Sequence, residues 1–122
     1  MKLHPSALGH LHTFTGYGTD YVMVNGTRHE ASLVVMPERM EAWPVAGFDA
    51  LAEEHFAFLA GLKPEVVLLG TGSRLRFPHP RLAAPLARAR IGYEVMDLQA
   101  ACRTYNILMA EERNVAAALL FA

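Results

Sequence analysis

The chain has 122 residues, of which 52% are hydrophobic and 19% are charged. This composition excludes a disordered chain and suits one folded domain over residues 1–122. The formal net charge of −1 gives no electrostatic footprint for nucleic acid, and no apolar run reaches the roughly 20 residues of a membrane span.

Cysteine usage and the first residues bear on the compartment. The sequence contains one cysteine, Cys102, which excludes an internal disulfide and favours a reducing environment. The first residues lack the apolar stretch of a secretory signal. We therefore expect a cytoplasmic protein.

Residues 21–36 predict an N-terminal β-hairpin. Asn25 and Gly26 lie between two strand-forming stretches, and this pair is typical of a two-residue type I′ turn. The second strand is expected to continue as far as Met36 and to stop at Pro37. Residues 37–47 then predict a loop or a short strand.

A helix is expected from Phe48 to Ala60. Gly61 is suited to the position just beyond the helix end, where a left-handed conformation is common. Five residues at helical spacing predict its buried face: Phe48, Leu51, His55, Phe58 and Leu59.

Residues 65–72 are the most informative stretch. A run of valine and leucine at residues 66–69 predicts a buried parallel strand over residues 65–69, since the run does not alternate with polar residues. Gly70, Thr71 and Gly72 follow, where an open α/β sheet would bind a ligand. The glycines permit a positive φ and a close backbone approach, so they suit either a ligand site or a tight turn.

The remaining elements complete an α/β pattern. A helix near residues 82–90 between two strands, at 65–69 and 92–96, predicts a parallel βαβ unit. Asp97 is suited to cap a helix over residues 98–110, and a buried strand follows at 115–121. The core face of that helix is predicted to comprise Leu98, Ala101, Cys102, Tyr105, Leu108 and Met109. The fold class is α/β, with three layers, a mixed central sheet, an N-terminal β-hairpin and flanking helices.

No cofactor and no metal is expected. The glycines resemble a dinucleotide-binding fingerprint, but Leu75 stands where its third glycine is needed and prolines delay the next helix. His10 and His12 are too few ligands for a structural metal. Cys102 is interpreted as a small buried hydrophobe in preference to a nucleophile.

Arg103 and Asn106 complete the candidate site. They lie one turn apart, early in a helix that follows a parallel strand, so they could face the same end of the sheet as Gly70 and Gly72. A guanidinium beside backbone N–H groups suits a carboxylate or phosphate. The alternative is a solvated helix face.

The sequence at residues 96–106, together with Gly70, Thr71 and Gly72 upstream, resembles a family of small, mostly uncharacterised α/β domains. That family includes mitochondrial complex I assembly factor 3 and stand-alone bacterial proteins. The positions that carry over are Gly70, Thr71, Gly72, Met96, Asp97, Thr104 and Asn106. One departure is Glu112, where relatives often have glycine.

The resemblance implies a three-layer fold with a mixed sheet and no established enzymatic activity. We therefore expect a non-enzymatic protein that binds protein partners, as an assembly factor for a respiratory or other complex does. The alternative is a small-molecule or anion-binding protein, or an enzyme, with its site at Gly70, Thr71, Gly72, Arg103 and Asn106.

Overall fold

The computed structural model describes residues 11–121, and residues 1–10 and 122 lie outside its described part. It contains a three-stranded sheet in the order β1-β2-β3 and a five-stranded sheet in the order β5-β4-β8-β6-β7. The elements are β1 Phe14–Tyr17, β2 Val22–Val24, β3 Thr27–His29, β4 Leu33–Met36, β5 Arg39–Ala42, the 3-10 helix η1 Phe48–Ala50, α2 Glu53–Gly61, β6 Val66–Thr71, the 3-10 helix η2 Pro80–Ala83, α3 Ala84–Arg88, β7 Gly92–Met96, α4 Leu98–Ala110 and β8 Val115–Leu120.

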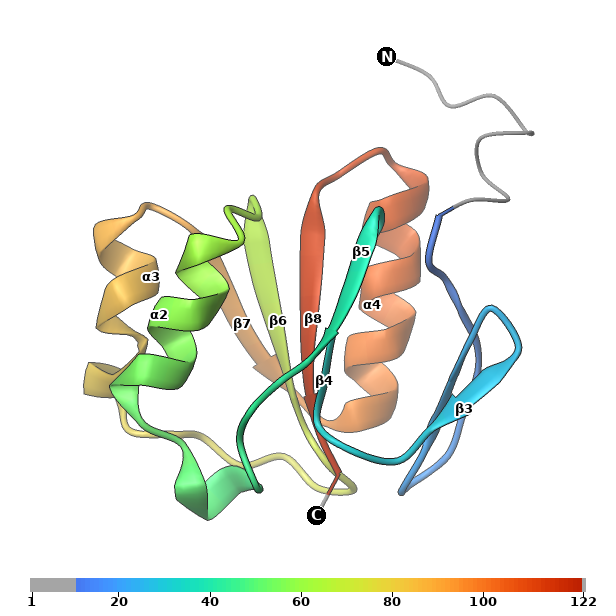
Figure 1. Cartoon of the computed structure of the whole chain (residues 1–122), viewed down its shortest axis with the longest axis horizontal. Coiled ribbons are helices and arrows are strands. Elements are labelled where there is room, and N and C mark those ends of the chain that lie inside the picture. The colour runs from blue at the N-terminus through green and yellow to red at the C-terminus, as the bar shows by residue number, and fades with distance from the viewer. Residues whose placement is uncertain (1–10, 122) are drawn as a thin grey trace.

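The larger sheet is mixed, as predicted. Strand β8 runs antiparallel to β4 and parallel to β6, and β6 runs parallel to β7. Helices α2 and α3 cover one face, while α4 and the small sheet lie on the other (Figure 1). The three-layer α/β fold predicted from the sequence is therefore confirmed.

The hairpin is confirmed, but its second strand is much shorter than predicted. Asn25 and Gly26 have φ angles of 48° and 85°, which are the positive values of a type I′ turn. Strand β3 then ends at His29, and β4 pairs in the larger sheet instead. The physical reason is burial: all four residues of β4 are buried, which requires a sheet covered on both faces.

The predicted helix over residues 48–60 is interrupted. Leu51 and Ala52 have extended ψ angles, and the His55 ring accepts the Ala52 N–H at 2.9 Å, so α2 begins at Glu53. The fully buried residues of α2 are Phe56, which the prediction missed, and Leu59, which it included. The predicted Phe48, Leu51 and Phe58 are partly buried against the same core. The left-handed residue after the helix is Lys63, with φ 58°, so the expected role of Gly61 is wrong.

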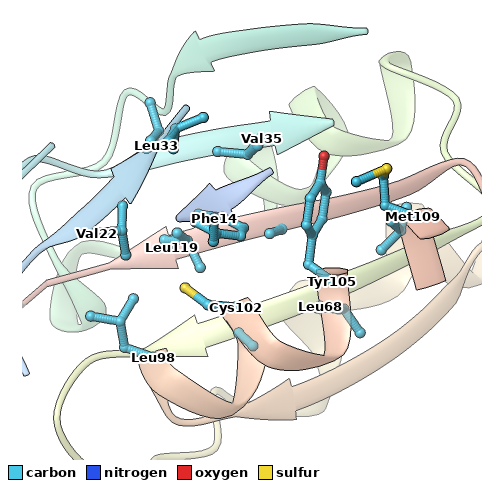
Figure 2. Close-up of a cluster of buried hydrophobic side chains, with 14 of the residues drawn as sticks. Phe14, Val22, Leu33, Val35, Leu68, Leu98, Cys102, Tyr105, Met109 and Leu119 are labelled. Atoms are coloured by element: carbon cyan, nitrogen blue, oxygen red, sulfur yellow. The ribbon is translucent and has the colours of Figure 1, made fainter. Parts of the chain in front are cut away.

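Two hydrophobic cores lie on opposite faces of the central sheet. The first core lies between the sheet and α4 with the small sheet, and the second core lies between the sheet and α2 with α3. Alternate residues of β8 point to each side: Val115, Ala117 and Leu119 face α4, whereas Ala116, Ala118 and Leu120 face α2 and α3. Figure 2 shows Leu98, Cys102 and Tyr105 projecting from α4 into the first core. The predicted core face of α4 is confirmed, except that Leu108 is only partly buried.

The βαβ unit is confirmed, but the single helix expected near residues 82–90 is the 3-10 helix η2 followed by the short helix α3. Strands β6 and β7 pair in parallel from Val66 opposite Gly92 to Gly70 opposite Met96. Pro85 lies in the first turn of α3, where its missing N–H leaves no hydrogen bond unmade. The unit brings the ends of β6 and β7 to one edge, beside the start of α4.

Candidate functional site

Gly70 belongs to strand β6, which runs two residues further than predicted. A Cβ atom there would lie 2.9 Å from Leu119 Cδ2, 3.2 Å from Ala101 Cβ and 3.5 Å from Leu98 Cα. Glycine is therefore required so that α4 can pack closely on the sheet. The close approach that the sequence indicated is made at this residue by the protein itself.

Thr71 is a buried residue that organises the end of β6. Its hydroxyl lies 2.8 Å from the carbonyl oxygen of Arg74 and 3.2 Å from that of Met96, and it accepts the Arg76 N–H at 3.1 Å. The hydroxyl thus holds the loop after β6 and ties it to the end of β7. These contacts use its single donor and one of its two acceptor positions.

Gly72 is the residue of the Gly-Thr-Gly segment that borders open space. Its φ of 89° lies in the left-handed region, and its carbonyl accepts the Leu98 N–H at 2.8 Å. A hollow of about 140 Å³ lies beside it. The hollow is lined by Gly18, Thr19, Gly72, Ser73, Asp97, Leu98 and Gln99.

The charge in this hollow is negative. Asp97 caps α4 as predicted, with Oδ1 accepting the Ala100 N–H at 2.8 Å. This carboxylate occupies the helix N-terminus, the position that an incoming anion would otherwise take. The hollow therefore suits a neutral polar or cationic group better than a phosphate or carboxylate.

Arg103 and Asn106 do not line this hollow. Arg103 is exposed on α4. The Asn106 side chain binds β1: Oδ1 accepts the Phe14 N–H at 2.9 Å and the Thr13 hydroxyl at 3.1 Å, and Nδ2 donates to the Phe14 carbonyl at 2.9 Å. Asn106 thus has a structural task, and a ligand-binding role for either residue stays a prediction.

Cys102 has the environment of a core residue. It is fully buried, and this burial raises the pKa of its thiol to about 12, while the Arg103 charge lowers it by a smaller amount. Burial likewise raises the pKa of Tyr105, whose hydroxyl donates to the His12 carbonyl at 2.8 Å. The thiolate needed for nucleophilic attack is therefore scarce at neutral pH.

Within residues 11–121, no group of three or more His, Cys, Asp and Glu side chains is placed to hold a metal ion. His12 binds the Met36 carbonyl through Nδ1 at 2.9 Å, and His10 lies outside the described residues. Trp43 is buried in the second core, and its indole N–H donates to the His55 carbonyl at 3.3 Å.

Sequence reasoning missed a segregation of charge that the structure makes conspicuous. Residues 73–93 contain five arginines and no aspartate or glutamate, although the whole chain has twelve carboxylates. The segment forms the loop after β6, helices η2 and α3, and the start of β7. Counting charges by segment would have found it, whereas the net charge of −1 concealed it.

Comparison with known proteins gives the chain a family. The model of a family described as "Protein of unknown function (DUF498/DUF598)" matches residues 14–120, from β1 to the end of β8. The chain belongs to the DUF498/DUF598 family.

Three relatives show the range of this DUF498/DUF598 family. NADH dehydrogenase (ubiquinone) 1 alpha subcomplex assembly factor 3 of Bos taurus is 32% identical over 106 residues, covering 85% of this chain and 58% of the relative. An uncharacterised protein of Rhodobacter capsulatus is 33% identical over 105 residues, covering 86% of this chain and 81% of the relative. The crystal structure of a protein from Bordetella parapertussis superposes with a TM-score of 0.85 and is 43% identical, covering 92% of this chain and 97% of that one.

The resemblance that the sequence indicated is thus confirmed. The chain spans a little more than half of the length of the bovine assembly factor. Within its described part, none of the helices of this DUF498/DUF598 protein combines the length and apolar character needed to span a bilayer.

Proposed function

We propose that this chain is a non-enzymatic protein-binding module that assists the assembly of a respiratory or other multiprotein complex. The observation that carries the proposal is its similarity to a complex I assembly factor along 85% of its length. The similarity extends over 106 residues, which is most of the α/β domain, so it is the domain as a whole that supports the proposal.

The loop after β6 supports a binding role. Phe77 and Leu75 expose 70% and 49% of their surface there. Arg76, between them in sequence, lies 4.1 Å above the Phe48 ring and pairs with Asp49 at 3.0 Å. These contacts attach the loop to η1, so its apolar side chains are presented with little loss of freedom on binding. Exposed apolar side chains of this kind are typical of protein-binding surfaces.

Affinity purification after in-cell cross-linking tests the proposal. A tagged full chain is expressed in the organism that encodes it, and its cross-linked partners are identified by mass spectrometry. We expect subunits of one multiprotein complex, together with assembly intermediates that accumulate on native gels when the gene is deleted. Normal complex assembly in the deletion strain, with no enriched partner, would contradict the proposal.

A matched pair of variants locates the surface. Changing Leu75 and Phe77 to serine should reduce capture of the partner, because it removes the exposed apolar side chains from the loop. Ile107→Ser changes another exposed apolar residue, on α4, where 60% of the side chain is exposed. The Ile107 variant should retain capture if the loop after β6 is the binding surface.

A second candidate function is small-molecule binding at Gly70, Thr71 and Gly72. The hollow beside Gly72 favours it. Thermal denaturation in the presence of a panel of neutral and cationic metabolites tests it, with Ser73→Trp as the variant that fills the hollow. A ligand that raises the melting temperature of the wild type but not of Ser73→Trp supports this function, and a panel without effect opposes it.

The proposal includes a cytoplasmic location. The single buried thiol of Cys102 suits a reducing compartment. Cell fractionation with an antibody against the chain tests this part.

A further inference from the structure

Strand β7 forms an open edge of the central sheet. It is the terminal strand, and no strand of the described residues pairs with its outer side. The Gly92 N–H donates to the Glu65 carbonyl at 3.0 Å, on the β6 side. Because backbone groups alternate in direction along a strand, the N–H and C=O groups of Tyr93 and Val95 point away from β6. This edge therefore offers donors and acceptors to an added strand.

An apolar groove lies beside the edge. It has a volume of about 280 Å³ and is lined by residues of η2, α3 and β7, among them Ala84, Ala87, Ile91 and Tyr93. The Tyr93 hydroxyl is the only polar side-chain atom among the residues that line this groove. It is buried, and it has no hydrogen-bond partner among the described residues. A buried hydroxyl left unpaired is costly, so the site has an unmet donor and acceptor.

The charge around the groove is positive. Every lining residue belongs to the segment of residues 73–93, which contains five arginines and no carboxylate. The next residue, Glu94, lies on the opposite face of the sheet from Tyr93 and Val95, because side chains alternate along a strand. Arg76 and Arg88 pair with Asp49 and Glu53 across to η1 and α2. Arg74, Arg81 and Arg90 are exposed and form no ion pair with the described residues. These arginines would favour the binding of a negatively charged partner.

We propose that the β7 edge binds an extended, acidic segment of a partner protein, which adds as a sixth strand to the central sheet. Its backbone pairs with Tyr93 and Val95, its apolar side chains enter the groove beside α3, and its carboxylates face the arginines. The inference rests on the proposed protein-binding function and specifies the chemistry of the partner. A second copy of the chain is disfavoured because two arginine-rich edges would repel each other, and a lipid headgroup does not use a row of strand N–H and C=O groups.

Selection from random peptides displayed on phage, against the immobilised full chain, tests the proposal. We expect enriched sequences in which apolar residues alternate with aspartate or glutamate. Synthetic copies should bind the wild type, and Ala87→Trp should weaken them at least about tenfold by filling the groove. Ala89→Trp is the matched control, because Ala89 is also exposed on the same helical segment but does not line the groove.

Charge, backbone and hydroxyl are tested separately with the same peptides. Arg81→Glu and Arg90→Glu should weaken binding at least about tenfold, whereas Arg103→Glu on the opposite face should not. Val95→Pro removes an outward N–H that β6 does not use, and should weaken binding while the melting temperature shows that the chain still folds. Tyr93→Phe should weaken binding without lowering the melting temperature, because its hydroxyl has no hydrogen-bond partner among residues 11–121 of the free protein.

The inference would be overturned by the absence of enriched acidic peptides, by peptides whose binding survives Ala87→Trp and the glutamate variants, or by self-association that Ala87→Trp abolishes. Binding of the chain to phosphatidylglycerol vesicles through Arg81 and Arg90, without peptide binding, would assign the charge to lipid and also overturn it.

A cellular partner that Ala87→Trp still captures would reject this edge but preserve the proposed function. Conversely, peptides that bind at β7 in a protein whose deletion leaves complex assembly normal would preserve the inference and reject the assembly role.

Discussion

Asn106 on α4 binds both backbone polar groups of Phe14 on β1, accepting its N–H and donating to its carbonyl, each at 2.9 Å. One side chain therefore acts as a strand partner on the outer side of β1, where no strand of the described residues pairs with it. The Phe14 ring in turn packs edge-on against Tyr105, with ring centroids 5.0 Å apart. The small sheet is thus attached to α4 by a polar contact and an apolar contact at the same point.

Removing this contact should destabilise the fold. Asn106→Ala leaves the Phe14 N–H and C=O without partners in a partly buried place, which should cost about 1–3 kcal/mol of unfolding free energy. Urea denaturation measures it. Arg103→Ala, one turn away and exposed, should change stability by less than about 0.5 kcal/mol. Equal stability of the two variants would show that the contact with Phe14 contributes little.

Gly70 should not tolerate even a methyl group. Gly70→Ala places a carbon 2.9 Å from Leu119 Cδ2 and 3.2 Å from Ala101 Cβ, so the buried Leu119 side chain and α4 must both give way. We expect a loss of about 1–3 kcal/mol in unfolding free energy, measured by urea denaturation. Gly61→Ala is the control, since a Cβ there meets nothing within 4 Å and alanine favours the helix. The assignment of Gly70 to packing fails if the Gly70 variant melts at the wild-type temperature.

Replacing Glu112 with glycine should stabilise the fold. Glu112 has a φ of 65°, in the left-handed region, where a residue with a Cβ atom is strained by roughly 1–2 kcal/mol. Glu112→Gly should therefore raise the unfolding free energy by about 0.5–1 kcal/mol. Its neighbour Glu111 has φ −88°, so Glu111→Gly should lower stability instead. A differential scanning calorimetry trace in which both variants melt earlier would argue against strain at Glu112.

Cys102 should make the fold sensitive to alkali. The pKa of its thiol is raised from 9.0 to about 12 in the folded state, so the folded chain keeps a proton that the unfolded chain loses first. Its contribution to stability is complete below pH 9 and is lost as the pH rises from 9 toward 12. Tyr93, with its pKa raised to about 12, acts in the same direction.

Urea denaturation at pH 8 and at pH 10.5 measures this effect. The stability lost between the two pH values should be smaller in Cys102→Ala than in the wild type. In the folded wild type at pH 8, a thiol reagent should label Cys102 only after denaturant is added. Rapid labelling of the native chain would show that the thiol is accessible.

Features that depend on neighbouring residues were predictable from the sequence. The turn at Asn25 and Gly26 and the cap at Asp97 are set by local backbone preferences, and both formed as expected. The apolar run before Gly70 and the helical spacing of apolar residues in α4 indicate burial directly. These local signals were enough to establish the layers and the mixed sheet.

Features that depend on distant residues were not predictable in the same way. Asn106 has the same side chain whether it meets a ligand or Phe14, which lies 92 residues away in sequence. Gly70 indicated that some group approaches the backbone closely, but the sequence did not identify that group as α4 rather than a ligand. Leu33 to Met36 continue a strand-like pattern after β3. They form a separate strand in the larger sheet because that sheet buries the side chains on both faces of β4.

The position of β8 sets an order on synthesis. It lies between β4 and β6, both of which precede it along the chain, and it is the sole link between the two halves of the central sheet. Until residues 115–120 leave the ribosome, the β4–β5 hairpin and the β6–α3–β7 unit each expose an apolar strand with an unpaired side. This domain is therefore most vulnerable to aggregation during synthesis while β8 is still in the exit tunnel, because both parts of its central sheet have emerged but the strand that joins them has not.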